Sequence, residues 1–252
     1  MIMSEKMYVL GANISHSKSP QLWSDIFDLR GLDWTYEKAD IAEEESARQF
    51  IKNKDYRAIN ITTPYKTLAL QTADCVNEIS KFCGGCNFLI NNSGRLSGYN
   101  TDGYGCLYAL RDVGCEFENT CITVCGSGPT AKSICYALLE AGAIVIMLTR
   151  DSSKVLLTTH PNNFMVLEYA QAVHEIPYAK IVVNASTLGM NQGDPSPIDE
   201  SLINTGHVIY DCVYGHGKTS LRSIAESKGA KYFDGSKMLY YQAQKCEEIL
   251  FA

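Results

Sequence analysis

One glycine-containing segment restricts the fold of this chain more than any other. Residues 120–125 (Thr-Cys-Ile-Thr-Val-Cys) form an apolar run typical of a buried β-strand, and residues 126–131 (Gly-Ser-Gly-Pro-Thr-Ala) follow directly. The sequence predicts a helix over 132–140, which Gly142 ends, and a second strand over 144–148. A strand, Gly-x-Gly-x-x-Ala, a helix and a strand in this order are typical of a dinucleotide-binding βαβ unit, and a plain βαβ turn without a ligand is the alternative.

Each residue type in this segment has a separate role in such a unit. The first glycine, Gly126, makes the tight turn, and Gly128 lets a pyrophosphate approach the backbone. Pro129 suits the first helical position because no N–H is needed there, although it removes one amide that could donate to a phosphate. The predicted cofactor contacts in this segment are Gly126, Ser127, Gly128, Pro129, Thr130 and Ala131.

The segment after the second strand bears on the choice of dinucleotide. An NAD site usually has Asp or Glu at this place to bind the ribose 2′-OH, whereas this chain continues Thr-Arg-Asp-Ser-Ser-Lys over residues 149–154. Two cations, Arg150 and Lys154, suit the 2′-phosphate of NADP. Asp151 would repel that phosphate if it pointed inward. The sequence therefore favours NADP, with NAD as the alternative.

A lysine just beyond another predicted strand is the first candidate for catalysis. A short β-run ends at Thr62, Pro64 rigidifies the following turn, and Lys66 comes next. The later turn Asn-Thr-Asp-Gly offers a carboxylate at Asp102, and a lysine beside a carboxylate can donate or accept a proton. Two alternatives remain, because Lys66 alone is typical of a solvated surface lysine and Asp102 of an N-cap for a helix over 104–112.

Two serines near the N-terminus are candidate ligand contacts. They follow the β-like residues 7–10, and Ser17 and Ser19 are spaced by two, so that in an extended loop their hydroxyls point to the same side. There they can bind one carboxylate or polyol at the carboxyl end of a strand. The alternative is a Ser-Pro turn that caps a helix beginning near Gln21.

Taken together, these motifs resemble those of the shikimate dehydrogenase family. The resemblance rests on Ser-x-Ser-Pro at 17–20, Asn-x-Thr-x-Pro-x-Lys at 60–66, Gly-x-Asn-Thr-Asp at 98–102, residues 184–190, Tyr214 with Thr219, and residues 235–242. They occur in the family order over essentially the whole chain. The resemblance implies reversible reduction of 3-dehydroshikimate by NADPH, a step of aromatic amino-acid biosynthesis.

The resemblance also implies a role for individual residues. Lys66 and Asp102 would be the catalytic pair that moves the proton, since the cofactor supplies the hydride. The substrate carboxylate and hydroxyls would be bound by Ser17, Ser19, Asn60, Thr62, Asn87, Tyr214 and Gln242. Cofactor contacts beyond residues 126–131 would be Thr149, Arg150, Lys154, Met190, Cys212 and Gly235.

Several positions depart from the family pattern. Trp23 stands where the family usually has His, His216 where many members have Pro, and Phe88 where the family has Thr. Because Phe88 would place bulk beside the substrate contact Asn87, we expect it to alter the preference for ring substituents. Two alternative functions follow: a sister oxidoreductase acting on quinate or another cyclic polyol, with NAD or NADP, and a non-catalytic dinucleotide-binding sensor.

Composition excludes several classes of partner. The 252 residues carry a net charge of −6, which argues against nucleic acid. No apolar run approaches the ~18 residues of a membrane span. Because Glu5 and Lys6 interrupt the N-terminal apolar residues, no secretory segment is predicted. We therefore expect a cytoplasmic protein. We further expect a monomer or homodimer, and the resemblance to the shikimate dehydrogenase family implies a small cyclic hydroxy acid as its partner.

The ten cysteines are expected to be reduced and mostly buried. Cys83 and Cys86 form a Cys-x-x-Cys pair, which is typical of a redox pair or half of a zinc site. No second such pair and no His-x-x-x-His accompanies it, and the sequence therefore predicts no metal site.

The order of predicted elements indicates two α/β domains. Strands and helices alternate in the first part, which is typical of a mixed or parallel sheet. The predicted strands are Met7–Leu10, Trp34–Lys38, Ala58–Thr62 and Asn87–Asn91, and the helices are Gln21–Leu29, Glu43–Lys52 and Thr67–Ala73. We expect residues 1–103, completed by a C-terminal helix at 236–252, to bind substrate, and residues 104–235 to form a Rossmann-type NADP-binding domain.

Overall fold

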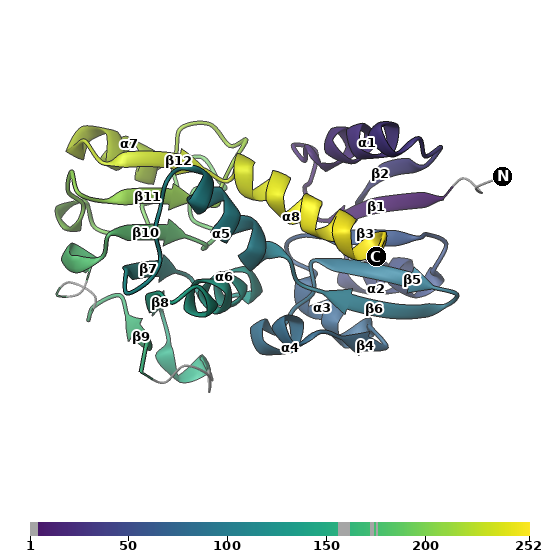
Figure 1. Ribbon diagram of the computed structural model, residues 1–252, viewed down its shortest axis with the longest axis horizontal. Helices are drawn as coiled ribbons and strands as arrows, with labels where there is room; N and C mark the ends of the chain where they lie inside the picture. Colours follow the sequence, from purple (N-terminus) through teal and green to yellow (C-terminus); the bar gives the residue numbers. More distant parts are fainter. Residues whose placement is uncertain (1–4, 156–161, 172–173, 175) are drawn as a thin grey trace. The chain divides into compact units, whose positions relative to one another are not determined.

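The computed structural model describes residues 5–155, 162–171, 174 and 176–252, without the side chains of residues 154 and 177 (Figure 1). Contacts divide the chain into unit 1, Met1–Asp102 with Gln242–Ala252, and unit 2, Gly103–Tyr241. The sequence assigned the whole last helix to the first domain, whereas residues 236–241 belong to unit 2. The reason is that Met238 and Tyr241 pack against the hydrophobic core of that unit.

Unit 1 is built on a mixed six-stranded sheet in the order β2-β1-β3-β5-β6-β4. Strand β1 pairs in parallel with β2 and β3, whereas β5 pairs antiparallel with β3 and β6. The strands are β1 (Lys6–Gly11), β2 (Thr35–Asp40), β3 (Ala58–Ile61), β4 (Cys75–Val76), β5 (Phe88–Asn92) and β6 (Arg95–Tyr99). The sequence missed β4 and β6, because β4 has two residues and β6 contains a glycine, which is depleted in strands.

Helices cover both faces of this sheet. Successive side chains of a strand point to opposite faces, so Phe88 packs in one hydrophobic cluster and Leu89 in another. The cluster around Phe88 includes residues of α1 and α8, and the cluster around Leu89 includes residues of α2 and α3. The helices are α1 (Ser19–Arg30), α2 (Glu44–Asn53), α3 (Lys66–Thr72), α4 (Glu78–Cys83), which the sequence missed, and α8 (Ser236–Leu250).

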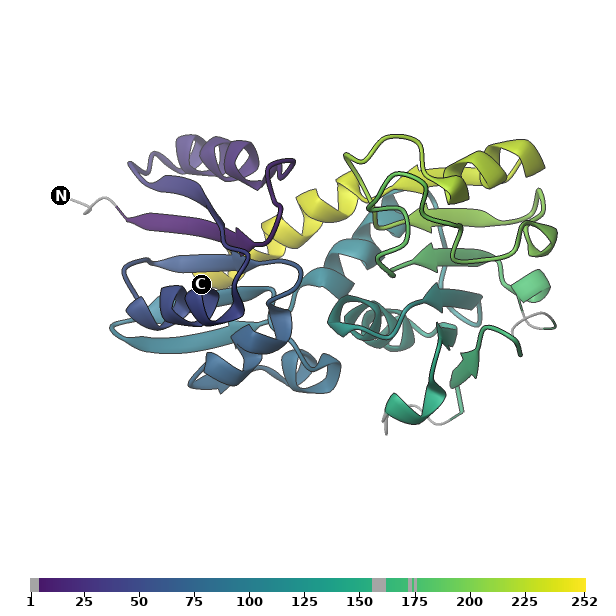
Figure 2. The same ribbon diagram turned by 180° about the vertical axis from the view of Figure 1, so that it is seen from behind.

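Unit 2 contains a six-stranded sheet in the order β12-β11-β10-β7-β8-β9 (Figure 2). All neighbouring strands are parallel. The strands are β7 (Cys121–Cys125), β8 (Ile144–Thr149), β9 (Phe164–Glu168), β10 (Ile181–Asn184), β11 (Val208–Asp211) and β12 (Lys231–Asp234). Counted from β7, this order is 6-5-4-1-2-3, the arrangement of a Rossmann fold, whose ligand crevice lies where the strand order reverses. The predicted fold class, two α/β domains of which one is Rossmann-type, is confirmed.

The helices of unit 2 include the one predicted after the glycine segment. Helix α6 spans Pro129–Glu140 and has the proline in its first turn, as the sequence predicted. The other helices are α5 (Asp102–Asp112) and α7 (Ser220–Lys228), with short 3₁₀ helices η1 (Ser152–Lys154), η3 (Ile176–Tyr178) and η4 (Glu200–Leu202). Within the described part of the chain, no helix is both long and apolar enough to cross a membrane.

Candidate functional site

Lys66 and Asp102 form an ion pair within unit 1. Lys66 is the first residue of α3, after a turn that contains the cis peptide Thr63–Pro64. The hydroxyl of Tyr65 anchors this turn, because it lies 2.8 Å from the backbone oxygens of both Ile41 and Ala42 and can donate its one hydrogen to either. The Nζ of Lys66 donates to Oδ2 of Asp102, and the two side chains are only 14% and 7% exposed. Lys66 is therefore not a solvated surface lysine.

A buried amide fixes the other oxygen of the same carboxylate. Asn87 donates from Nδ2 to Oδ1 of Asp102 at 2.9 Å and accepts at Oδ1 from the Thr101 backbone N–H at 2.8 Å. The same Nδ2 lies 2.9 Å from Oγ1 of Thr101 and 3.2 Å from Oε1 of Gln242. A charged pair that is nearly removed from solvent is stable only where its polar atoms are hydrogen-bonded, as they are here. The site thus holds an ammonium beside an oriented carboxylate, which is an arrangement that can transfer a proton.

Asn60 joins this cluster from β3. Its Oδ1 accepts from the hydroxyl of Tyr36 at 2.8 Å, and its Nδ2 donates to Sγ of Cys246 at 3.5 Å. Thr62 follows the same strand, and a Cβ at Gly11 would lie 2.5 Å from the Cγ2 of Thr62. Only glycine therefore fits where β1 passes this threonine.

The loop that carries Ser17 and Ser19, here called the serine loop, is hydrogen-bonded to the end of β2. The carboxylate of Asp40 accepts from the backbone N–H groups of Asn13 at 2.8 Å and Ile14 at 3.2 Å. Ser19 is buried at the start of α1, and its N–H donates to Oγ of the half-buried Ser17 at 3.3 Å. The N-cap of α1 is Lys18, which makes no side-chain capping bond. A substrate contact at the two hydroxyls remains a prediction.

The glycine segment of unit 2 leaves room for a phosphate group. Gly126 has φ +110°, and a Cβ there would meet the backbone oxygen of Ala185 at 2.9 Å. At Gly128, the N-cap of α6, a Cβ would meet nothing within 4 Å. The space beside the N-cap of this twelve-residue helix is therefore open, and backbone amides at a helix N-terminus suit the pyrophosphate of a dinucleotide. The hydroxyl of Ser127 accepts from Oγ1 of Thr149 at 3.0 Å, which ties this turn to the end of β8.

Arg150 and Asp151 follow the end of β8 and differ in their surroundings. Arg150 is exposed. The carboxylate of Asp151 accepts from N and Oγ of Ser153, at 3.1 and 2.6 Å, and so caps η1. These two bonds fix the carboxylate of Asp151 to its own turn. The side chain of Lys154 lies outside the described part of the structure.

The remaining predicted contacts of unit 2 follow β10, β11 and β12. A Cβ at Gly235 would lie 2.2 Å from the backbone oxygen of Cys212, so the chain passes here with no room for a side chain. Met190 and Tyr214 are half-buried, and burial raises the pKa of Tyr214. The phenol therefore stays protonated at neutral pH and can donate a hydrogen bond. Tyr214 belongs to unit 2, whereas the other six predicted substrate contacts belong to unit 1.

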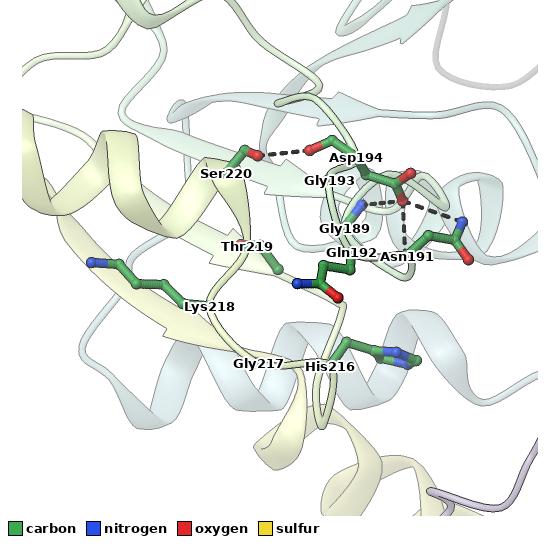
Figure 3. Close-up of a pocket in the computed structure, with 10 residues that line it drawn as sticks. All are labelled: Gly189, Asn191, Gln192, Gly193, Asp194, His216, Gly217, Lys218, Thr219 and Ser220. Atoms are coloured by element: carbon green, nitrogen blue, oxygen red, sulfur yellow. Dashed lines mark hydrogen bonds between the residues drawn. The ribbon is translucent and has the colours of Figure 1, made fainter.

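A pocket of about 270 Å³ lies between two loops of unit 2, residues 189–194 and 216–220 (Figure 3). The first loop is closed on itself, because the carboxylate of Asp194 accepts from the backbone N–H groups of Gly189 at 3.0 Å and Asn191 at 2.9 Å. These bonds lower the pKa of Asp194. The hydroxyl of Ser220 joins the loops by donating to the backbone oxygen of Asp194 at 2.6 Å.

Comparison with known proteins decides the family. Residues 9–89 match the family model described as the shikimate dehydrogenase substrate binding domain. The NADP(+)-dependent shikimate dehydrogenase of Aquifex aeolicus is 31% identical over 243 residues, which cover 96% of this chain and 89% of that protein. The chain belongs to the shikimate dehydrogenase family.

Solved structures of the family share the fold along the whole chain. Shikimate dehydrogenase of Thermus thermophilus in complex with NADP(H) and shikimate superposes with a TM-score of 0.84 at 28% identity, over 98% of this chain and 93% of that one. The enzyme of Listeria monocytogenes in complex with shikimate and NAD has a TM-score of 0.80 at 25% identity, over 100% of this chain and 93% of that one. Both dinucleotides thus occur in shikimate dehydrogenase structures.

Two residues of the cluster in unit 1 were missed by sequence reasoning. Thr101 donates from Oγ1 to the backbone oxygen of Gln242 at 3.1 Å, and Tyr36 holds the amide of Asn60. Thr101 stands inside the Asn-Thr-Asp motif, which was a usable signal. Tyr36 lies on an edge strand far from Asn60 in sequence, and nothing in its local pattern indicates the contact.

Two departures from the shikimate dehydrogenase pattern contact each other. The rings of Trp23 and Phe88 are stacked, with centroids 6.3 Å apart and planes at 19°. Both side chains are fully buried in the cluster between the sheet, α1 and α8. Phe88 is the first residue of β5, directly after Asn87, and its ring is buried in this cluster. The fully buried ring exposes no surface to a substrate, and its effect on the preference for ring substituents remains a prediction.

The Cys-x-x-Cys pair has the environment of structural thiols. Cys83 and Cys86 are buried, and desolvation raises the pKa of Cys83 to about 12 and that of Cys86 to about 11. A reactive cysteine has a lowered pKa instead. Among the described residues, no three His, Cys, Asp or Glu side chains converge as a metal site.

Proposed function

We propose that this protein is an NADP-dependent shikimate dehydrogenase that reversibly reduces 3-dehydroshikimate to shikimate. The observation that carries the proposal is the buried ion pair of Lys66 and Asp102, with Asn87 fixing the second carboxylate oxygen. A merely structural dinucleotide-binding protein has no need of a nearly buried lysine at this place. Membership of the shikimate dehydrogenase family supports the same reaction.

The protein's own part in this reaction is the transfer of a proton. Bound NADPH supplies the hydride to the substrate carbonyl carbon. Lys66 gives its proton to the carbonyl oxygen, and in the reverse direction the neutral amine takes the proton from the hydroxyl. Asp102 accepts a hydrogen bond from a neighbouring substrate hydroxyl and holds both partners in line. Because Lys66 is hydrogen-bonded to one carboxylate oxygen, its ammonium group already has a fixed position. The side chain therefore needs to move little before the proton is transferred.

The substrate contacts divide by chemistry. Ser17, Ser19 and Tyr214 offer hydroxyl donors, which suit the carboxylate of shikimate. Asn60, Thr62, Asn87 and Gln242 offer amides and a hydroxyl, which suit the ring hydroxyls. The support in unit 1 is the hydrogen-bonded cluster that connects Asn87 with Gln242 and Asp102.

NADP is the proposed cofactor. Residues 126–131 would hold the pyrophosphate at the N-terminus of α6, and Thr149, Arg150 and Lys154 would face the 2′-phosphate side of the adenosine. Met190, Cys212 and Gly235 would line the nicotinamide side. The exposed guanidinium of Arg150 and the capping role of Asp151 support NADP over NAD.

We further propose a cytoplasmic monomer or homodimer that binds neither nucleic acid nor membranes. The net charge of −6 disfavours a polyanionic partner. All ten cysteines are free thiols, which is typical of a reducing compartment.

An absorbance assay at about 340 nm, the band of reduced nicotinamide, tests the function. Shikimate and quinate are each paired with NADP and NAD, and kcat/KM is measured for the four pairs. The proposal predicts the highest kcat/KM for shikimate with NADP. A preference for NAD would favour an NAD-linked sister enzyme, which is the second candidate because the Listeria monocytogenes relative was solved with NAD. Dinucleotide binding without turnover of either acid would favour a sensor.

A further inference from the structure

One fully buried carboxylate in unit 2 has no part in the proposed chemistry. Asp211 is the last residue of β11, and its side chain is 0% exposed. Burial of a charge is costly unless the charge is paired or fully hydrogen-bonded. Within the described residues no cation is paired with this carboxylate, so its stabilisation has to come from neutral donors.

Four neutral donors surround the two oxygens of Asp211. Oδ1 accepts from Nδ2 of Asn184 at 2.9 Å and from the backbone N–H of Val213 at 3.2 Å. Oδ2 accepts from Oγ1 of Thr219 at 2.9 Å and from the hydroxyl of Tyr232 at 3.1 Å. An ionised carboxylate can accept all four bonds, whereas neither a protonated acid nor an amide can.

These donors come from separate segments at the carboxyl edge of the sheet. Asn184 ends β10, Val213 follows β11, Thr219 is the N-cap of α7, and Tyr232 lies on β12. Ligands of open α/β sheets bind at this edge. The carboxylate therefore fastens four neighbouring segments together at the edge where a dinucleotide binds.

The same bonds set the position of both loops that line the pocket of unit 2. Asn184 connects Asp211 to the first loop, because its Nδ2 also donates to the backbone oxygen of Leu188 at 3.0 Å. Gly189 follows, and a Cβ there would lie 3.1 Å from Cγ2 of Thr219. Thr219 belongs to the second loop, beside Ser220 (Figure 3). Met190 lies just beyond Gly189, and Tyr214 just beyond Val213.

We propose that Asp211 is a positioning residue, which holds the loops after β10 and β11 in the conformation that binds the dinucleotide. The inference rests on the proposed function, since it assigns Met190 and Cys212 to the cofactor side. Asp211 touches no reacting atom and acts through the two loops.

The variant Asp211→Asn tests this inference. Its amide has one acceptor oxygen and turns an NH₂ group toward donors, so at least one of the four segments loses its bond. We expect the Kd for NADPH, measured by fluorescence, to rise about tenfold or more, as for the loss of a charge-assisted hydrogen bond. The control Asp199→Asn removes another carboxylate of unit 2, which caps η4 on the surface, and should bind NADPH like the wild type.

A second pair of variants keeps the test decisive if Asp211→Asn does not fold. Thr219→Val removes one donor to Asp211 together with the acceptor that caps α7, whereas Thr219→Ser keeps the hydroxyl for both bonds. We expect Thr219→Val to raise the Kd for NADPH at least threefold, and Thr219→Ser to restore it. A lower Tm with an unchanged Kd in both Asp211→Asn and Thr219→Val would make Asp211 only structural and overturn the inference. The Kd for NADPH is measured without shikimate turnover. A wild type that does not oxidise shikimate would therefore contradict the proposed function without affecting this test.

Discussion

Asn87 donates to Oδ1 of Asp102 at 2.9 Å, on the carboxylate oxygen that Lys66 does not use. The carboxylate is thereby held from both sides, and its plane is fixed relative to the ammonium. Since proton transfer requires heavy atoms within hydrogen-bond reach and in line, this double hold prepares the pair before a substrate arrives.

The serine loop gives the first prediction. Ser17→Ala or Ser19→Ala should raise KM for shikimate about ten- to a hundredfold, because each loses a charge-assisted hydrogen bond of about 1.5–3 kcal/mol. KM for NADP should barely change. Steady-state kinetics of both variants measure this, with Ser15→Ala as control, since that side chain is exposed in the same loop. Normal shikimate binding in both variants would mean that the loop serves only the start of α1.

The second prediction concerns cofactor choice. Arg150→Ala should remove most of the preference for NADP, a loss of about ten- to a hundredfold in kcat/KM, and should hardly change the use of NAD. The control Lys180→Ala removes an exposed cation directly before β10. Arg150 directly follows β8, so the two cations lie at opposite edges of the parallel sheet.

Asp151 modifies this second prediction. Asp151→Thr should sharpen the preference for NADP only slightly, because the wild-type carboxylate is bonded to Ser153 and the hydroxyl of Thr can take over the cap. A large gain from Asp151→Thr would show that the carboxylate faces the phosphate in solution. An unchanged preference in Arg150→Ala would remove Arg150 from the 2′-phosphate site.

The stacked pair of Trp23 and Phe88 gives the third prediction. Phe88→Thr should lower the free energy of unfolding by about 3–5 kcal/mol, because a fully buried ring is removed from the core. KM for shikimate should stay within about threefold of the wild type, since the ring is fully buried and exposes no surface to a substrate. Guanidinium denaturation and kinetics of the same preparation measure both effects. Unchanged stability with an altered preference between shikimate and quinate would place the ring at the substrate.

Local sequence signals predicted the residues of the candidate site better than the contacts that hold those residues in place. The strand, glycine turn and helix around Gly126 follow from short-range pattern and chain geometry, and the structure has them in the predicted places. The pairing of Lys66 with Asp102 was accessible because each stands in a motif with a proline or an Asn-Thr-Asp turn. Short elements such as β4 and α4 carry too few residues for a periodic signal.

Contacts between distant segments were not predictable in the same way. The four donors to Asp211 come from strands and loops that only the sheet order brings together, and no local pattern connects Asn184 with Tyr232. The bonds of Asp151 to Ser153 span two residues, yet the orientation of one carboxylate depends on whether a 3₁₀ turn forms. The stack of Trp23 on Phe88 likewise required the packing of α1 on the sheet.

Turnover of Lys66→Ala tests the central claim most directly. Shikimate oxidation is followed by NADPH absorbance at saturating NADP, and shikimate binding is measured separately by calorimetry. Lys81→Ala, which removes an exposed lysine of α4 in the same unit, is the control. We predict that Lys66→Ala lowers kcat by about two to four orders of magnitude and leaves shikimate binding broadly intact, as expected for loss of a general acid or base. Near-normal turnover in Lys66→Ala would contradict the assignment of the proton to this lysine.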